Sequence, residues 1–414
     1  MAILKPFKAF RPVKDKAAMV ASKPYDVINT REARAEAEGN DLSFLHIVKP
    51  EIDFPDDQDP YALQVYIRGR DNFRGLCENN IMIQDESECY YIYMLEKDKR
   101  QQTGIVGCAD IEDYFNDIIL KHELTRPDKE EDRKNHVRVT NMNAEPVFFA
   151  FRRVKELDKL IEDLKKSDPE YDFTAPDGVR HVVWKVDDPK SIDSISNHFE
   201  QIEHTYVADG HHRTAAAALV GRELKNKNRY HQGIEEYNYF MAVHFPDNQL
   251  QIRDYNRIVK DLNGLSRETF LELLGQSFEI KSNGPAQYKP QKLHEFGMYL
   301  EGNWFILSAK EGTYDDQDPI GVLDVTILSD QILKPILGIE DLRTDKRIDF
   351  VGGTRGLEAL EKRVNSGEMK VAFALYPVTM NQLMDIADSG KIMPPKVTWF
   401  EPKLASGLFV HMLD

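Results

Sequence analysis

The chain has 414 residues, 41% of them hydrophobic and 30% charged, which is enough for two or three domains with real cores or for one large elaborated domain. Its formal net charge of −16 argues against a broad nucleic-acid-binding surface, but a small basic pocket for a nucleotide is still allowed. Three scattered cysteines predict a reducing compartment rather than a disulfide framework. Neither a signal peptide nor a run of ~20 apolar residues is found, so we expect a cytoplasmic protein without membrane spans.

Periodicity and turn residues divide the chain into strands and helices without a regular βαβ alternation, which predicts an α+β fold of mixed sheets and helices. Before residue 250 we expect an extended segment at 1–30, helices at 31–38, 60–79, 155–166 and 190–199, and strands at 43–48, 90–95, 103–109, 146–152, 181–186 and 239–245. After it we expect helices at 267–275, 325–336, 355–366 and 380–388, and strands at 296–301, 303–309 and 371–376. The expected domains are an N-terminal α/β region over 1–115, a core over 116–250 and a C-terminal α+β region over 251–414.

A short apolar strand, a polar corner and an alanine-rich helix follow one another over residues 205–218. Gly210 lets the backbone come close to a ligand, and a helix start offers unpaired N–H groups and a partial positive charge. Three further donors follow the glycine: His211, His212 and Arg213. The stretch from Asp209 to Thr214 therefore predicts a phosphate cradle, with an ordinary helix cap as the alternative.

Residues 121–133 form the densest polar cluster, directly after an apolar element. Pro127 interrupts this run, so Glu123 stands at the end of the apolar element and not on a long exposed helix. Its neighbours His122 and Arg126 could orient the carboxylate or shift its pKa. Glu123 is therefore a candidate catalytic residue or ligand, with a solvated charged helix as the alternative.

The donor residues limit the metal chemistry that we expect. Adjacent His211 and His212 point in different directions, so they favour no zinc site. A Mg²⁺ ion delivered with nucleotide phosphates needs only one or two carboxylates, and Asp209 and Glu123 are the natural candidates. No sequence motif for a nucleophile supports covalent catalysis.

Two segments near the C-terminal end could also reach a ligand. Three cationic residues stand before the glycine pair at 352–353 and could hold an anion, or could form an ordinary charged loop: Arg343, Lys346 and Arg347. The proline-rich, aromatic segment 393–403 could line a site, although such residues usually serve packing.

Six motifs, taken in order, resemble those of one bacterial and archaeal family, the domain of unknown function 1015. They are residues 23–28 (KPYDVI), 43–51 (SFLHIVKPE), 121–133 (KHELTRPDKEEDR), 208–213 (ADGHHR), 343–353 (RTDKRIDFVGG) and 393–403 (MPPKVTWFEPK). The resemblance covers essentially the whole chain. More distantly, H-E followed by D-G-H-H-R is similar to the ParB/sulfiredoxin-type nucleotide-binding fold, some of whose members are kinases that phosphorylate free L-serine.

This second resemblance implies that the core at 116–250 is an ATP-dependent kinase making O-phospho-L-serine, with ADP or CTP left open as the nucleotide. Glu123 would be the base, with Asp209 and His212 beside it in catalysis. Nucleotide phosphates and Mg²⁺ would be held by Asp209, Gly210, His211, His212, Arg213 and Thr214. The acceptor would be bound by His122, Arg126, Arg343, Lys346 and Arg347.

Two other functions stay open at this point. One is a nucleotide-binding switch or partner-binding protein without phosphoryl transfer. The other is a metal-dependent hydrolase that uses His211, His212 and Asp209. The expected partners are a nucleotide and a free amino acid, without nucleic acid or membrane, and a homodimer is compatible with the sequence.

Overall fold

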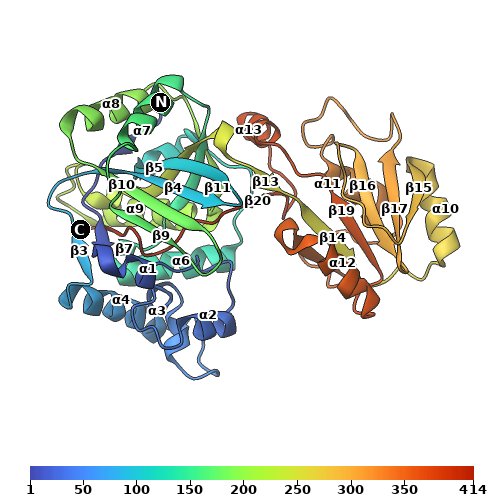
Figure 1. Cartoon of the computed structure of the whole chain (residues 1–414), viewed down its shortest axis with the longest axis horizontal. Helices are drawn as coiled ribbons and strands as arrows, with labels where there is room; N and C mark the ends of the chain where they lie inside the picture. The colour runs from blue at the N-terminus through green and yellow to red at the C-terminus, as the bar shows by residue number, and fades with distance from the viewer. The chain divides into compact units, whose positions relative to one another are not determined.

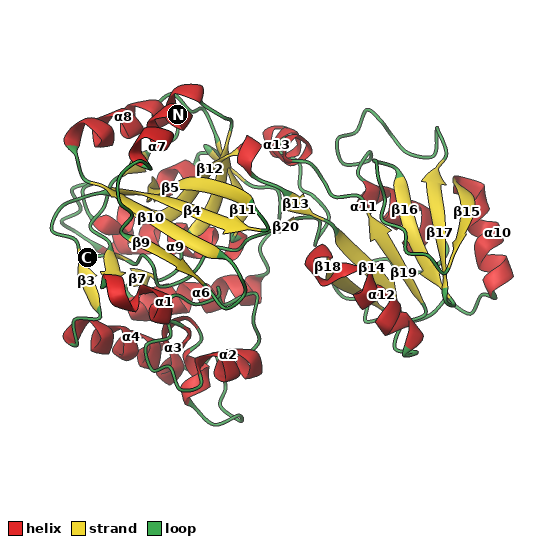
Figure 2. Cartoon of the chain, in the orientation of Figure 1, coloured by secondary structure: helices red, strands yellow, loops and turns green.

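The computed structural model describes all 414 residues, which form two compact units: residues 1–250 with 402–414, and residues 251–401. Both units mix sheets with helices (Figure 2), so the predicted α+β class is confirmed. The three-part domain division stays a prediction, whereas strands from before and after residue 115 belong to one sheet of the structure. No helix has both the length and the apolar character needed to cross a lipid bilayer.

A nine-stranded sheet organises the first unit (Figure 1), in the order β6-β11-β8-β12-β5-β4-β10-β9, with β1 also paired to β5. Its strands are β1 (Leu4–Lys5), β4 (Tyr90–Lys97), β5 (Arg100–Asp110), β6 (Ile119–Leu120), β8 (Val147–Phe151), β9 (Tyr171–Thr174), β10 (Arg180–Val186), β11 (Thr205–Asp209) and β12 (Tyr239–Pro246). β6 runs parallel to β11 and β8 runs parallel to β12, while the other pairs are antiparallel. Two short ribbons pair β2 (Phe10–Pro12) with β3 (Met82–Gln84), and β7 (Met142–Asn143) with β21 (His411–Met412).

Helices and the C-terminal segment bury this sheet. The helices of the unit are α1 (Ala17–Val20), α2 (Thr30–Ala37), α3 (Leu45–Val48), α4 (Leu63–Glu78), α5 (Ile111–Phe115), α6 (Pro127–Thr140), α7 (Lys155–Leu164), α8 (Pro189–Phe199) and α9 (His211–Lys227). Alternate residues of β8 point toward α9 and α8: Val147 and Phe149 share a core with α9, and Phe151 shares one with α7 and α8. On β4, Tyr90 and Ile92 belong to the same core as α7 and α8, whereas Tyr91 and Tyr93 contact Phe409. The two faces of this strand therefore pack against different layers.

The alanine run of α9 explains how this helix reaches the sheet. Ala215 to Ala218 are all buried, and such short side chains let the helix backbone lie close to its neighbours. Three residues after this run, a Cβ on Gly221 would meet the carbonyl of Tyr237. The helix is therefore fixed against the sheet, and its first turn is held at the end of β11.

Most of the elements expected in this unit are present, and one is wrong. The expected strand at 43–48 is the helical turn α3. Five of these six residues are buried, and an apolar run buried on all sides does not distinguish a strand from a helix by its period. The expected extended segment at 1–30 also contains helical turns, over Lys14–Lys16 and Ala17–Val20.

The second unit is built on a six-stranded antiparallel sheet in the order β15-β17-β16-β19-β14-β18. Its strands are β14 (Tyr255–Val259), β15 (Phe278–Gly284), β16 (Glu295–Leu300), β17 (Asn303–Ala309), β18 (Ile348–Gly352) and β19 (Val371–Leu375), and a ribbon pairs β13 (Ile252–Arg253) with β20 (Trp399–Phe400). Its helices are α10 (Arg267–Ser277), α11 (Asp324–Leu328), α12 (Gly356–Asn365) and α13 (Met380–Asp388). The helix expected at 325–336 is shorter, because a π-helical turn replaces its second half.

His244 gives the first unit a predicted acid sensitivity. Its ring lies in β12, 5.2 Å from the ring centroids of both Phe149 and Phe199, and burial lowers its pKa to about 3. Unfolding restores the ordinary pKa near 6.5, so the unfolded chain binds more protons below that pH and the free energy of unfolding falls. His244→Phe should flatten this decline by up to about 1.4 kcal/mol per pH unit between about pH 6 and 4.5. Urea unfolding of both proteins across this range measures it, and two parallel pH curves would contradict the assignment.

Candidate functional site

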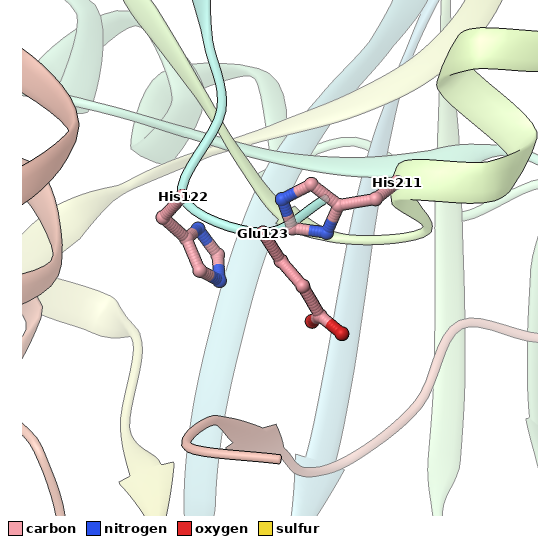
Figure 3. A group of neighbouring side chains, drawn as sticks. All are labelled: His122, Glu123 and His211. Atoms are coloured by element: carbon pink, nitrogen blue, oxygen red, sulfur yellow. The ribbon is translucent and has the colours of Figure 1, made fainter. Parts of the chain in front are cut away.

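Two motifs meet at one edge of the nine-stranded sheet. β6 and β11 are parallel neighbours, with Ile119 opposite Thr205 and Leu120 opposite Tyr206. Parallel strands end at the same edge, so the segment after β6 and the corner after β11 emerge side by side. The first carries His122 and Glu123 and the second begins α9 (Figure 3). The topology therefore brings together the KHE and DGHHR motifs, which are almost ninety residues apart.

The corner after β11 has the backbone geometry that the glycine predicts. Gly210 has φ of 92° and ψ of 36°, in the left-handed region, and it is the N-cap of α9. A Cβ here would lie 3.0 Å from Val147 Cγ1 and 3.1 Å from Arg213 Nε. A glycine also has no side chain with which to cap the helix, so the N–H groups of the first turn are available to other acceptors.

Gly210→Ala should lower the free energy of unfolding by roughly 1–2 kcal/mol, because alanine disfavours the left-handed backbone. The loss should be larger if the Val147 side chain cannot move away from the added Cβ. Gly233→Ala is the matched control: its φ is 89°, and no atom lies within 4 Å of the added Cβ. Thermal unfolding of both variants separates the cost of the left-handed backbone from the cost of the close contacts at Gly210. An equal loss of stability in both variants would contradict those contacts.

Three neighbouring side chains come together at this corner (Figure 3). His122, Glu123 and His211 each offer a nitrogen or oxygen atom within 4.8 Å of the others. The two imidazole rings meet edge to face, 4.5 Å apart at 90°. His122 is 1% exposed and His211 is 8% exposed, whereas Glu123 is half-buried. Sequence reasoning placed His122 and His211 in separate roles and did not foresee that they touch.

Burial keeps both imidazoles neutral. It lowers the pKa of His122 to about 4, against the opposing effect of the Asp209 charge. It lowers the pKa of His211 as well, and the nearby charges of His122, His212 and Lys121 act in the same direction. The Nε2 atom of His211 is buried without a hydrogen-bond partner. Both rings can therefore offer lone pairs at neutral pH.

His212 turns the other way, as the sequence predicts for adjacent histidines. Its Nε2 accepts a hydrogen bond from the backbone N–H of Arg126 at 3.0 Å. The neutral ring therefore carries its proton on Nδ1. The guanidinium of Arg126 is 66% exposed and pairs with Asp128 at 2.9 Å. The two segments are thus joined by a hydrogen bond as well as by the strands.

Asp209 and Arg213 are held in a network of charges. Lys403 Nζ lies 3.1 Å from Asp209 Oδ2, and Arg213 Nη2 lies 3.5 Å from the same oxygen. Arg213 also donates to the Pro146 carbonyl at 2.8 Å and lies 3.5 Å from Asp26. Only 9% of Arg213 is exposed, and it stays charged because the carboxylates raise its pKa against the cost of burial. Its predicted role as a phosphate ligand stays a prediction, and its contacts here are structural.

Glu145 connects this network to both ends of the chain. Its Oε1 accepts from the backbone N–H of Tyr25 at 3.0 Å and from the Ser406 hydroxyl at 2.8 Å. Burial raises its pKa, while the charges of Arg213 and Arg133 oppose that rise. A cavity of about 30 Å³, room for a water molecule, adjoins these groups and is lined by Arg133, His136, Val137, Asn143, Ala144, Glu145, Val147, Arg213, Ala216, Ala217, Phe240 and Met241. The motif at 23–28 therefore contacts this network through the backbone of Tyr25.

Three residues of this network were not predicted from the sequence as site residues: Asp26, Glu145 and Lys403. Asp26 and Lys403 lie inside the motifs at 23–28 and 393–403, and membership in those motifs is the only sequence signal that could have indicated them. Thr214, by contrast, is fully buried, and its hydroxyl donates to the Gly210 carbonyl at 3.0 Å, which stabilises the first turn of α9.

The cationic cluster at 343–347 lies in the second unit. Arg347 donates to the Leu337 carbonyl at 3.0 Å and the Gly338 carbonyl at 2.8 Å, so it organises its own loop. Arg343 and Lys346 are exposed. Their predicted part in acceptor binding stays a prediction. For this segment the sequence left open an anion-binding role or an ordinary charged loop, and the structure shows that it contains the strand β18.

Comparisons with known proteins give the family of the chain. No curated protein matches it. Among solved structures, a conserved hypothetical protein from Pyrococcus furiosus is 15% identical, with a TM-score of 0.35 over 75% of this chain and 95% of that chain. A free serine kinase mutant in complex with AMP is 12% identical, with a TM-score of 0.36 over 73% of this chain and 92% of that chain. SbnI with a C-terminal truncation from Staphylococcus aureus is 12% identical, with a TM-score of 0.40 over 74% of this chain and 87% of that chain.

Likeness at this level establishes no shared function. A family model, in contrast, matches residues 4–326, more than three quarters of the chain. Its description is "Protein of unknown function (DUF1015)". The chain therefore belongs to the DUF1015 family.

Proposed function

We propose that this protein transfers the terminal phosphoryl group of ATP to the hydroxyl group of a free amino acid, with L-serine as the first acceptor to test. The observation that carries the proposal is the convergence of Glu123 with the glycine corner of α9 at one sheet edge. Phosphoryl transfer needs mainly positioning and charge neutralisation, and this edge offers groups for both. The choice of serine follows from the similarity of the H-E and D-G-H-H-R motifs to ParB/sulfiredoxin-type serine kinases. ADP is the alternative donor.

The phosphates would bind at the start of α9. Gly210 keeps the backbone accessible, and the helix N-terminus favours negative charge. His212 can donate its Nδ1 proton, and Lys403 adds positive charge next to Asp209. A Mg²⁺ ion arriving with the phosphates would neutralise their charge, and Asp209 at this corner would be the carboxylate ligand that it needs, which leaves Glu123 for the acceptor.

Glu123 would be the base for the acceptor. As the acceptor oxygen forms its bond to phosphorus, the bond to the leaving nucleotide breaks and the hydroxyl proton passes to Glu123. Such a base contributes about 10²- to 10⁴-fold to a rate. Arg126 is exposed on the same loop, and its guanidinium suits the acceptor carboxylate. His122 positions Glu123 from the preceding residue, and Arg343, Lys346 and Arg347 stay secondary candidates for the acceptor.

The metal-dependent hydrolase built on His211, His212 and Asp209 gains no support from the geometry. His211 contacts His122, His212 accepts from Arg126, and Asp209 faces Lys403, so the three residues have different neighbours. The nucleotide-dependent switch is kept as an outcome of the experiment below.

The test is to incubate the full-length protein with ATP, Mg²⁺ and a mixture of free amino acids, and to analyse the products by mass spectrometry. O-phospho-L-serine is the expected product, and a parallel sample with ADP identifies the donor. A different phosphorylated amino acid would keep the kinase and replace the acceptor. Nucleotide binding without any phosphorylated product would overturn the kinase in favour of the switch.

A further inference from the structure

We propose that His122, Glu123 and His211 together bind one divalent transition-metal ion. Two of these residues follow β6 and the third begins α9, so the group joins the two segments that form the sheet edge (Figure 3). The inference goes beyond phosphoryl transfer and does not depend on it.

The distances suit a single ion. The ligand atoms of the three side chains all lie within 4.8 Å of one another. Metal–nitrogen and metal–oxygen bonds of about 2.0–2.2 Å put two ligands of a tetrahedral ion about 3.3–3.6 Å apart. Side-chain rotations that move these atoms by up to about 1 Å would therefore close the group around an ion, without a change in the backbone.

The second observation is an unsatisfied atom. His211 is 8% exposed, and its Nε2 is buried without a hydrogen-bond partner. An unpaired buried polar atom costs about 1–3 kcal/mol, and native structures contain few of them without a reason. Coordination would remove this cost. The neighbouring His122 ring is 1% exposed and contacts His211 directly, so the ion would be screened from solvent on that side.

The donor set selects the class of ion. Two imidazole nitrogens with one carboxylate oxygen are typical of catalytic zinc sites and of non-haem iron sites, whereas Mg²⁺ prefers oxygen ligands. Three protein ligands also leave coordination positions for water or a substrate oxygen. A carboxylate that binds through one oxygen keeps the second, so Glu123 could serve this ion and still accept a proton.

The experiment uses the full-length protein after chelator treatment, titrated with Co²⁺ alone and followed by its visible absorption, without nucleotide or amino acid. We expect saturation at one Co²⁺ per chain and displacement by Zn²⁺, which binds such sites more tightly than Co²⁺. His211→Gln and Glu123→Gln should each weaken Co²⁺ binding by more than about tenfold. Glu130→Gln is the matched control: this carboxylate lies next to the same loop but outside the group, and its loss should leave the titration unchanged.

Glu123→Gln is nearly isosteric at a half-buried position, so it tests the site even where a histidine variant fails to fold. The inference is overturned when no stoichiometric Co²⁺ spectrum forms, or when Glu123→Gln binds Co²⁺ as the unchanged protein does. An equal loss in Glu130→Gln and Glu123→Gln would also overturn it, because it would indicate a general effect on the loop. Since no nucleotide is present, failure here is separate from failure of the kinase, which the mass-spectrometric experiment measures.

Discussion

Replacing Glu123 with glutamine should reduce the turnover of phosphoryl transfer by about 10²- to 10⁴-fold while the nucleotide still binds. Glutamine has nearly the same shape as glutamate but cannot take a proton from the acceptor hydroxyl. The phosphate cradle belongs to the start of α9, so removing this carboxylate should leave the nucleotide dissociation constant nearly unchanged. Steady-state kinetics combined with nucleotide titration measures both quantities.

Glu130→Gln is the control for this experiment. Its carboxylate accepts a hydrogen bond from Thr125 at 2.6 Å, so it lies next to the same loop without belonging to the His122–Glu123–His211 group. We expect its turnover to stay close to that of the unchanged protein. Full turnover in Glu123→Gln would show that another group accepts the proton, and equal losses in both variants would indicate a general effect on the loop.

Arg213→Met should destabilise the first unit by roughly 3–5 kcal/mol, the usual cost of breaking a buried ion pair. Arg213 is 9% exposed and lies 3.5 Å from both Asp26 and Asp209, with the charge of Glu145 also nearby. Methionine fills much of the same volume but removes the cation from Asp26 and leaves Asp209 with Lys403 alone. Denaturant unfolding of the variant at neutral pH measures the loss.

Arg138 is the surface control for this prediction. Arg138 pairs with Glu131 at 2.7 Å and Glu223 at 2.6 Å, but it is 31% exposed, so Arg138→Met should cost only about 0–1 kcal/mol.

The pH dependence of stability gives a second test. Burial raises the pKa of Glu145, so this carboxylate takes up its proton early as the pH falls and then needs no cation. The deficit of Arg213→Met should therefore shrink as the pH falls through the raised pKa of Glu145. Equal stability of the Arg213 and Arg138 variants would contradict the network.

The elements with a clear period could be predicted from the sequence, and the buried run at 43–48 could not. The helices α4 and α9 and the hairpin of β4 and β5 have apolar spacing and turn residues that indicate one structure each. The run at 43–48 is mostly apolar and mostly buried, and its helical turn depends on packing against α4, which local sequence does not specify.

The candidate site divides in the same way. The glycine corner at the start of α9 is local, since one glycine and one helix start define it, and the structure shows Gly210 there with a left-handed backbone. The contact of His122 with His211 depends on the parallel pairing of β6 with β11, and Lys403 reaches Asp209 across 194 residues of chain. Arg213 illustrates the limit: the sequence indicates a cation beside the cradle, but only the fold determines that carboxylates surround it.

The most direct test of the central claim is the stoichiometry of the reaction, followed by ³¹P NMR with ATP, Mg²⁺ and L-serine. The account predicts one phosphoserine for every ADP formed, with both signals lost together in Glu123→Gln. ADP that accumulates with inorganic phosphate and without phosphoserine would contradict it, because the site would then transfer the phosphoryl group to water.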